Sequence, residues 1–124
     1  AQGYSIDKEG ISSICYLEQK NCLLIGGKNA WMFVFDLNTR KTIHSFPAHN
    51  WPIYQIIYNS EIGLFSCSRD KIIKKWDFET LETLERYSWP SYKGHTHSIN
   101  NLCFVPPYKY LVSIGDDKSI CIWK

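Results

Sequence analysis

The sequence of 124 residues has little alanine, no apolar run long enough to span a membrane and no N-terminal hydrophobic segment. It contains 3 Ala against 15 Ile, 8 Tyr and 6 Phe, a balance that favours the pleated surface of a β-sheet over helices. A membrane-spanning helix needs about 18 or more consecutive apolar residues, and the first ten residues, AQGYSIDKEG, do not have the apolar core of a signal peptide. These absences predict an all-β globular domain without a membrane partner.

Charge and cysteine content narrow the classes of partner and compartment. The net charge is +2, from 14 basic and 12 acidic residues, a surplus too small to favour nucleic acid as a partner. The five cysteines are odd in number, show no C-x-x-C spacing and lie in apolar runs, where cysteine acts as a small hydrophobic residue. We therefore expect a reducing, intracellular location, cytoplasmic in preference to nuclear.

What the sequence does contain is an internal repeat. LFSCSRDKIIKKWD (residues 64–77) and LVSIGDDKSICIWK (residues 111–124) share a leucine, a serine, an aspartate and a tryptophan at the same positions, without a gap. Upstream of each copy, AHNWPIYQIIY aligns with GHTHSINNLCF, which makes His49 equivalent to His95. A fainter first copy includes ISSICY and LLIGGKNAWMFVFD. The chain therefore comprises three repeats, with limits near residues 7–46, 49–87 and 95–124.

Short apolar runs separated by turn residues predict the strands of each repeat. They are expected at 11–17, 22–26, 31–37 and 42–46, then at 53–58, 64–68, 72–77 and 83–87, and finally at 99–104, 110–114 and 119–123. One segment has two interpretations, because Phe78, Leu81, Leu84 and Tyr87 are spaced three apart, as on the face of a helix. The equivalent segment 36–46 instead suits a turn followed by a strand, and both alternatives remain open.

These residues resemble the WD-repeat family of β-propellers, whose signature is a Gly-His pair, an Asp turn and a closing Trp-Asp. The resemblance is carried by Ala48-His49, Ser66, Asp70 and Trp76-Asp77 in the second repeat, and by Gly94-His95, Ser113, Asp117 and Trp123 in the third. The first repeat departs from it with Asp7, Ile25, Asn29 and Phe35, and Lys124 stands at the final Asp. The resemblance implies a propeller segment of three four-stranded antiparallel blades, the last ending at its third strand.

The repeated polar residues could be mistaken for a Ser-His-Asp catalytic set. A chain from the Trp76 N–H to Ser66, from Ser66 to His49 and from His49 to Asp70 would satisfy every buried donor, and the family resemblance implies the same relay. A nucleophile needs an exposed oxygen beside an oxyanion site, which such a serine lacks. We therefore expect structural tetrads, also at His95, Ser113, Asp117 and Trp123, and no enzyme. The histidines and cysteines show no zinc spacing, so no metal or cofactor is expected.

Lys75 interrupts an otherwise apolar position in the third strand of its repeat, where the other repeats have Val34 and Ile122. Either its stem lies along the neighbouring blade with the amine in water, or the amine meets an acidic partner.

One rim of the expected propeller is a candidate binding surface. In this family the Gly-His loop and the Asp turn share one end of each blade, a common partner-binding face. An exposed Trp beside an Arg has the composition of interface hot spots; alternatively, Trp51 packs beneath its own loop. The residues placed on this rim are Trp51, Pro52, Arg69, His97, Ser98 and Asp116, with Glu9, Gly10 and Lys28 at the equivalent positions of the first repeat.

An insertion also leads toward this rim. SWPSYKG (residues 88–94) adds five residues to the connection before His95 and carries Trp89 and Tyr92, two aromatic residues that are costly to expose without a function. The alternative is that this loop folds onto the outer edge of its own blade.

Taken with the resemblance, these patterns predict a scaffold segment that binds protein or peptide partners. Two other functions are a phosphopeptide reader, which would need a cluster of arginines on the rim, and a regulatory propeller attached to an enzyme domain outside these residues. Closed propellers typically have about four to eight blades. We therefore expect further blades from a parent protein, in preference to a second copy that supplies the missing strands.

Overall fold

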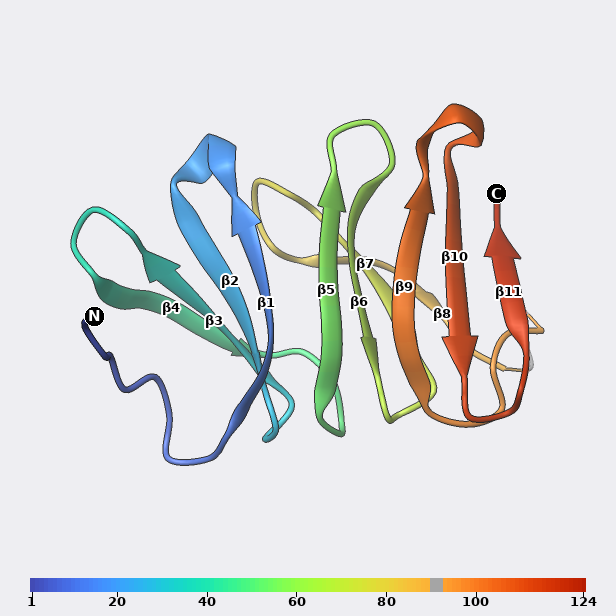
Figure 1. Ribbon diagram of the computed structural model, residues 1–124, viewed down its shortest axis with the longest axis horizontal. Helices are drawn as coiled ribbons and strands as arrows, with labels where there is room; N and C mark the ends of the chain where they lie inside the picture. The colour runs from blue at the N-terminus through green and yellow to red at the C-terminus, as the bar shows by residue number, and fades with distance from the viewer. Residues whose placement is uncertain (90–92) are drawn as a thin grey trace.

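The computed structural model, which describes residues 1–89 and 93–124, is built from three antiparallel sheets that stand side by side in an open arc (Figure 1). We call these sheets blades 1, 2 and 3. Blade 1 contains β1 (Ile11–Leu17), β2 (Cys22–Gly27), β3 (Trp31–Asp36) and β4 (Lys41–Pro47). Blade 2 contains β5 (Ile53–Asn59), β6 (Gly63–Ser68), β7 (Ile73–Trp76) and β8 (Thr83–Tyr87). Blade 3 contains β9 (Ile99–Val105), β10 (Tyr110–Gly115) and β11 (Ile120–Trp123).

The all-β propeller architecture expected from the sequence is confirmed. Each blade follows chain order from one edge to the other, so every connection within a blade is a hairpin. Two single-turn 3-10 helices, η1 (Glu18–Lys20) and η2 (Pro106–Tyr108), cap the hairpins at the end opposite the rim. Within the described residues blade 3 has three strands rather than four. The sheets do not close into a ring, and the two chain ends lie at opposite ends of the arc (Figure 1).

The helical alternative for residues 77–87 is wrong, because this segment is a turn followed by strand β8. The Asp77 carboxylate accepts hydrogen bonds from the backbone N–H groups of Glu79 and Thr80 at 2.9 and 2.8 Å, which closes the turn. Leu81 then adopts a left-handed conformation, with φ of 60°, and β8 pairs antiparallel with β7. The spacing of three among apolar residues therefore reflects a turn plus an alternating strand.

The turns between the second and third strands, β2–β3, β6–β7 and β10–β11, share a left-handed residue at the same position in every blade. Ala30, Lys71 and Lys118 occupy equivalent positions with φ of 74°, 72° and 66°, a left-handed region that costs energy for a residue with a side chain. In each turn the preceding Asn or Asp accepts a hydrogen bond from the backbone N–H two residues on, at 3.0 to 3.1 Å. The repeated Asx residue thus stabilises an unfavourable turn.

The apolar core between the blades forms two separate clusters, and a smaller third cluster lies within blade 1. The first joins blades 1 and 2, and its buried members include Leu24, Met32, Ile53, Ile56 and Trp76. The second joins blades 2 and 3 through Phe65, Cys67, Ile73, Ile99, Leu102 and Leu111. Each blade is therefore stabilised mainly by the faces of its neighbours, as in repeat architectures generally.

Polar side chains cross the same two interfaces. The Ser12 hydroxyl donates to the carbonyl of Ile53 at 2.6 Å, which joins blades 1 and 2 near their inner strands. The Gln55 side-chain carbonyl accepts from the backbone N–H of Leu102, which joins blades 2 and 3. The Lys20 ammonium in η1 of blade 1 donates to the carbonyl of Phe78 in the β7–β8 turn, which also joins blades 1 and 2.

Lys75 contacts an aromatic ring of its own blade, a partner that neither predicted arrangement named. Its Nζ lies 5.8 Å from the centroid of the Phe65 ring, in the cluster between blades 2 and 3. Its stem also passes over Gly63, where a Cβ would come within 3.1 Å of the Lys75 Cε. The side chain therefore lies along the interface between the blades with its amine over an aromatic face.

The first ten residues form no strand, although residues 2–6 align with the end of an outer strand in the repeat frame. They instead lie against the outer side of blade 1, where Ile6 packs on Ile25, Phe33 and Phe35. The Tyr4 ring is 5.5 Å from that of Phe35, and the Arg40 guanidinium donates to the Tyr4 hydroxyl at 3.1 Å. This segment therefore covers an apolar face of blade 1 and pairs with no described strand.

Candidate interaction rim

The rim is the side of the molecule on which the β2–β3, β6–β7 and β10–β11 turns of the three blades lie, at the lower edge of Figure 1. His49 and His95 enter the rim just before β5 and β9, the innermost strands of blades 2 and 3. Beneath each His lies a buried Ser from the second strand, Ser66 or Ser113. The rim is therefore built on polar residues that are themselves part of the interior.

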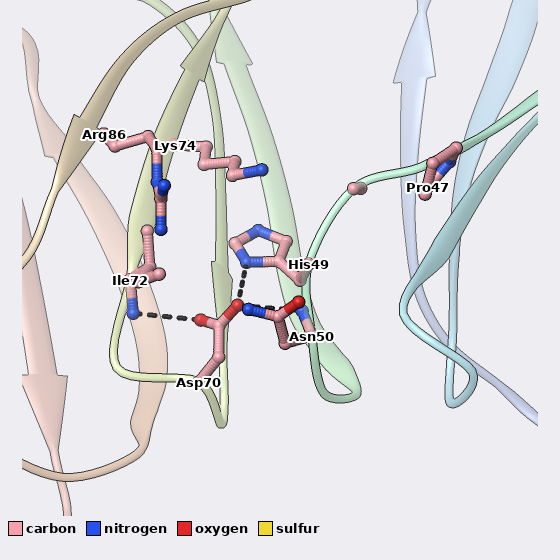
Figure 2. Close-up of a pocket in the computed structure, with 8 residues that line it drawn as sticks. Pro47, His49, Asn50, Asp70, Ile72, Lys74 and Arg86 are labelled. Carbon is pink, nitrogen blue, oxygen red and sulfur yellow. Dashed lines mark hydrogen bonds and ion pairs between the residues drawn. The ribbon is translucent and has the colours of Figure 1, made fainter.

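A complete hydrogen-bonded relay links the four tetrad residues of blade 2. The Trp76 indole N–H donates to the Ser66 oxygen at 2.8 Å, and the same oxygen is 2.7 Å from His49 Nε2. His49 Nδ1 is 2.8 Å from the Asp70 carboxylate, as Figure 2 shows. Because the Ser66 oxygen already accepts from the indole, its hydroxyl donates to Nε2, which assigns the proton of the neutral ring to Nδ1.

Blade 3 has the same relay. Trp123 Nε1 donates to Ser113 at 2.9 Å, His95 Nε2 is 2.7 Å from Ser113, and His95 Nδ1 is 3.0 Å from Asp117. Ser119 adds a hydroxyl that donates to the Asp117 carboxylate at 2.6 Å. Ser119 was not predicted as a member of this set, because Ile72 stands at the same position in blade 2.

Both tetrad carboxylates are held in the ionised form. Burial alone would raise the pKa of Asp70, but hydrogen bonds from His49 and from the backbone N–H groups of Asn50 and Ile72 outweigh it and lower the pKa. Burial likewise opposes ionisation of Asp117, where hydrogen bonds from Ser119, His95 and the Thr96 backbone N–H lower the pKa further. Each Asp therefore acts as an anionic acceptor at neutral pH.

Blade 1 keeps the turn and loses the relay. Asn29 caps its turn through the Trp31 backbone N–H at 3.0 Å, just as Asp70 does through Ile72. Its amide also donates to the Asp7 carboxylate at 2.8 Å, in an exposed pair at the place of the buried His–Asp contact. Ile25 replaces the central serine. The departures of the first repeat are therefore mutually consistent.

Trp51 and Arg69 form an exposed pair on the rim of blade 2. The Trp51 side chain is 53% exposed, and Arg69 Cζ lies 5.0 Å from the centroid of its ring. The two loops are joined beneath the pair, since the Ser68 hydroxyl donates to the Trp51 carbonyl at 3.0 Å and the Arg69 N–H to that of Pro52 at 3.3 Å. The pair is thus a surface feature on a fixed backbone, and Trp51 is not packed beneath its loop.

The rim of blade 3 is polar. His97 is exposed, and its Nδ1 is 2.9 Å from the Thr96 hydroxyl. The Asp116 N–H donates to the Ser98 carbonyl at 2.9 Å. Asn100, which the sequence did not single out, connects the two loops by donating to the Asp116 carboxylate at 2.6 Å. A sequence signal that could have indicated Asn100 is a polar amide at the second residue of β9, a position that faces solvent.

The insertion before His95 contributes Trp89, which is 54% exposed and lines a surface hollow together with Ile72 and Thr96. This position brings it near the rim residues of both blades 2 and 3. Tyr92, the other aromatic residue predicted for this loop, lies outside the described residues.

Comparisons with known proteins agree with this repeated geometry. The family model described as WD domain, G-beta repeat matches residues 40–77 and 88–124, more than half of the chain. The chain belongs to the WD-repeat family. The first matched segment begins in the β3–β4 turn of blade 1 and ends after β7 in blade 2. The second begins after β8 of blade 2 and ends after β11 in blade 3. A WD repeat therefore crosses from one blade to the next, and its Ala48-His49 pair lies at the crossing.

Individual WD-repeat relatives are distant and much longer. The chain is 27% identical to the WD repeat-containing protein 53 homolog of Dictyostelium discoideum, over 88% of this chain and 30% of the relative. It is 28% identical to the Anaphase-promoting complex subunit cdh1 of the same organism, over 91% of this chain and 15% of the relative. It is 25% identical to human Pre-mRNA-processing factor 17, over 94% of this chain and 20% of the relative. The chain thus spans less than a third of the length of these relatives.

WD repeats are generally non-catalytic, and the chemistry of this rim agrees with that. Ser66 has no exposed surface, and its oxygen is occupied by the indole of Trp76, so it cannot attack a substrate. Across residues 1–89 and 93–124, no three His, Cys, Asp or Glu side chains gather in a group that could hold a metal ion. The same residues contain no helix with the length and apolar character needed to span a bilayer.

Proposed function

We propose that this chain is part of a non-catalytic WD-repeat scaffold, which binds protein or peptide partners through the rim of blades 2 and 3. The observation that carries the proposal is the Trp51–Arg69 pair, an exposed indole with a guanidinium stacked on its face. Trp and Arg are the residue types most enriched among those that dominate binding energy at protein interfaces. The hydrogen bonds from the Ser68 hydroxyl and the Arg69 backbone N–H hold both loops before a partner arrives, which lowers the entropic cost of binding.

The other rim residues extend this surface. Trp89 adds an aromatic contact between the blades, while His97, Ser98 and Asp116 supply polar groups at its edge, a division typical of an interface core and its border. Membership of the WD-repeat family supports a role in assemblies, and one relative is named as a subunit of the anaphase-promoting complex. In the proposal, further blades of a parent protein or a second copy complete the ring.

The proposal includes an intracellular location. All five cysteines are free, and burial raises the pKa of the Cys67 thiol to about 12, so that it stays protonated and unreactive. Free, buried thiols suit a reducing compartment.

The test is affinity capture with the protein in its natural flanking sequence, comparing Trp51→Ala and Arg69→Ala with Tyr108→Ala. Tyr108 is a matched control because it is an exposed aromatic residue, stacked on Tyr110, in η2 at the opposite end of blade 3. Each rim variant should weaken the captured partner by more than about 1 kcal/mol, and Tyr108→Ala should not. If both rim variants recover the same partners as the parent while Tyr108→Ala loses them, the binding surface is at the other end.

A further inference from the structure

A pocket of about 200 Å³ opens at the junction of blades 1 and 2, beside the His49–Asp70 contact, and neither Trp51 nor Arg69 is among its lining residues. Pro47, the last residue of β4, and Ala48, which follows it, line one side of the pocket; Figure 2 shows Pro47 on the side away from Ile72 and Arg86. The opposite wall is the face of β7 and β8, with Ile72, Lys74 and Arg86. Tetrad residues form its floor, so the pocket has a rigid base.

Two cations share the β7–β8 wall. Lys74 and Arg86 are directly opposite each other in the register of the two strands, an arrangement in which like charges repel. Within residues 1–89 and 93–124, neither side chain makes an ion pair or a hydrogen bond; Lys74 Nζ only lies 5.3 Å from the ring of Trp76. Burial and the neighbouring Arg86 lower the pKa of Lys74. The wall thus carries positive charge without a matching anion.

Asp70, the one carboxylate in the pocket, does not supply that anion. Its oxygens accept from His49 at 2.8 Å, from the Asn50 N–H at 3.1 Å and from the Ile72 N–H at 3.0 Å. Besides the ring of His49, the lining holds two positive charges, on Lys74 and Arg86, and one negative charge, on Asp70. A singly charged guest would balance it, whereas a doubly charged phosphate would leave an excess of negative charge next to Asp70.

We propose that this pocket binds the side-chain carboxylate of an Asp or Glu in a partner polypeptide, paired with Lys74 and Arg86. The Arg86 guanidinium suits two parallel hydrogen bonds to a carboxylate, and the Lys74 ammonium supplies a point charge beside it. The bound carboxylate lies between the two cations and removes their repulsion. The Asn50 side chain, which also lines the pocket, offers an amide to the guest's backbone.

The test follows the side-chain NMR signals of Lys74 and Arg86 in the protein with its natural flanking sequence, at constant ionic strength. Three probes are titrated: N-acetyl-glutamic acid amide, which carries one side-chain carboxylate, its neutral glutamine analogue, and inorganic phosphate. The glutamate probe should shift both signals and reach saturation, and the glutamine probe should not. Lys74→Met and Arg86→Met should each weaken the glutamate probe by about tenfold or more, and Lys74→Arg should retain binding.

Lys75→Met is the matched control, because Lys75 is the next residue on β7 and points to the opposite face, toward Phe65. Lys75→Met removes one positive charge, as Lys74→Met does, and should bind the glutamate probe as tightly as the unsubstituted protein. Equal responses to the glutamate and glutamine probes, or unchanged binding in Lys74→Met and Arg86→Met, would overturn the proposal. Phosphate binding more tightly than the glutamate probe would also overturn it, by assigning the pocket to phosphoryl groups.

The inference goes beyond the proposed scaffold function and is tested without the rim. A failure of the glutamate probe would leave partner capture by Trp51 and Arg69 unaffected, and the reverse also holds.

Discussion

Replacing His49 by alanine tests whether the tetrads contribute to stability as the geometry indicates. The imidazole side chain is fully buried, and it bridges Ser66 at 2.7 Å and Asp70 at 2.8 Å. In the variant the Ser66 hydroxyl loses its acceptor, and Asp70 loses one of its donors. The backbone N–H groups of Asn50 and Ile72 still donate to Asp70.

The expected loss is about 2 kcal/mol of unfolding free energy, within a range of roughly 1–3 kcal/mol for an unpaired buried partner. The lower part of the range reflects two features of the site. Asp70 keeps two backbone donors, and the pocket of about 200 Å³ beside His49 gives water a way to reach the exposed groups. The upper part applies if water does not reach Ser66, which has no exposed surface.

The measurement is urea denaturation of the protein in its natural flanking sequence, with the free energy compared only where the denaturant slope is unchanged. Asp7→Ala is the matched control, because Asp7 stands at the position of His49 in blade 1 and, among the described residues, accepts hydrogen bonds only from the exposed Asn29 amide and the nearby Glu9 N–H. It should cost less than about 0.5 kcal/mol, as surface substitutions usually do. Equal losses in His49→Ala and Asp7→Ala would refute the reasoning about the relay.

Two further predictions concern the same interior. Trp76→Ala should cost about 3–5 kcal/mol in the same denaturation assay, because it leaves a cavity in the cluster between blades 1 and 2 and removes the indole donor of Ser66, which keeps its bond to His49. A loss below that of His49→Ala would contradict it. For pH, the lowered pKa of Asp70 means that its contribution to stability is complete above the unfolded value of about 3.9 and is lost as the pH falls through the folded value. Asp70→Asn should therefore flatten the decline of melting temperature below about pH 4, and an unchanged slope would show that Asp70 is not its source.

Much of the fold could be predicted because the sequence repeats its local signals. Alternating apolar residues and Asx turns placed all eleven strands within about two residues, the usual uncertainty of strand ends. Each tetrad was predictable because Ser, Asp and Trp recur with one spacing, with His 17 residues before the Ser in blade 2 and 18 in blade 3, and one hydrogen-bond order satisfies all their donors. The ambiguous segment 77–87 failed as a helix because Asp77 closes a turn through backbone N–H groups, which apolar spacing does not encode.

The pocket between blades 1 and 2 was not predictable from local patterns. Lys74 and Arg86 are twelve positions apart in sequence, and they face each other only through the β7–β8 register, which shifts between Lys75 and Trp76. Such a shift changes which side chains meet across the strands. The position of residues 2–6 was likewise not predictable. This segment packs on an apolar face of blade 1, and the strand propensity of its own residues carries no information about that face.

The separation of the core between the blades into two clusters makes the chain a short series of nearest neighbours. Blade 2 takes part in both clusters, whereas blades 1 and 3 each share only one of them. A lesion in blade 3 weakens one boundary and leaves the other intact, so damage there can remain local. A lesion in blade 2 weakens both boundaries together, which makes the middle sheet the element that determines whether the chain unfolds as one unit or in parts.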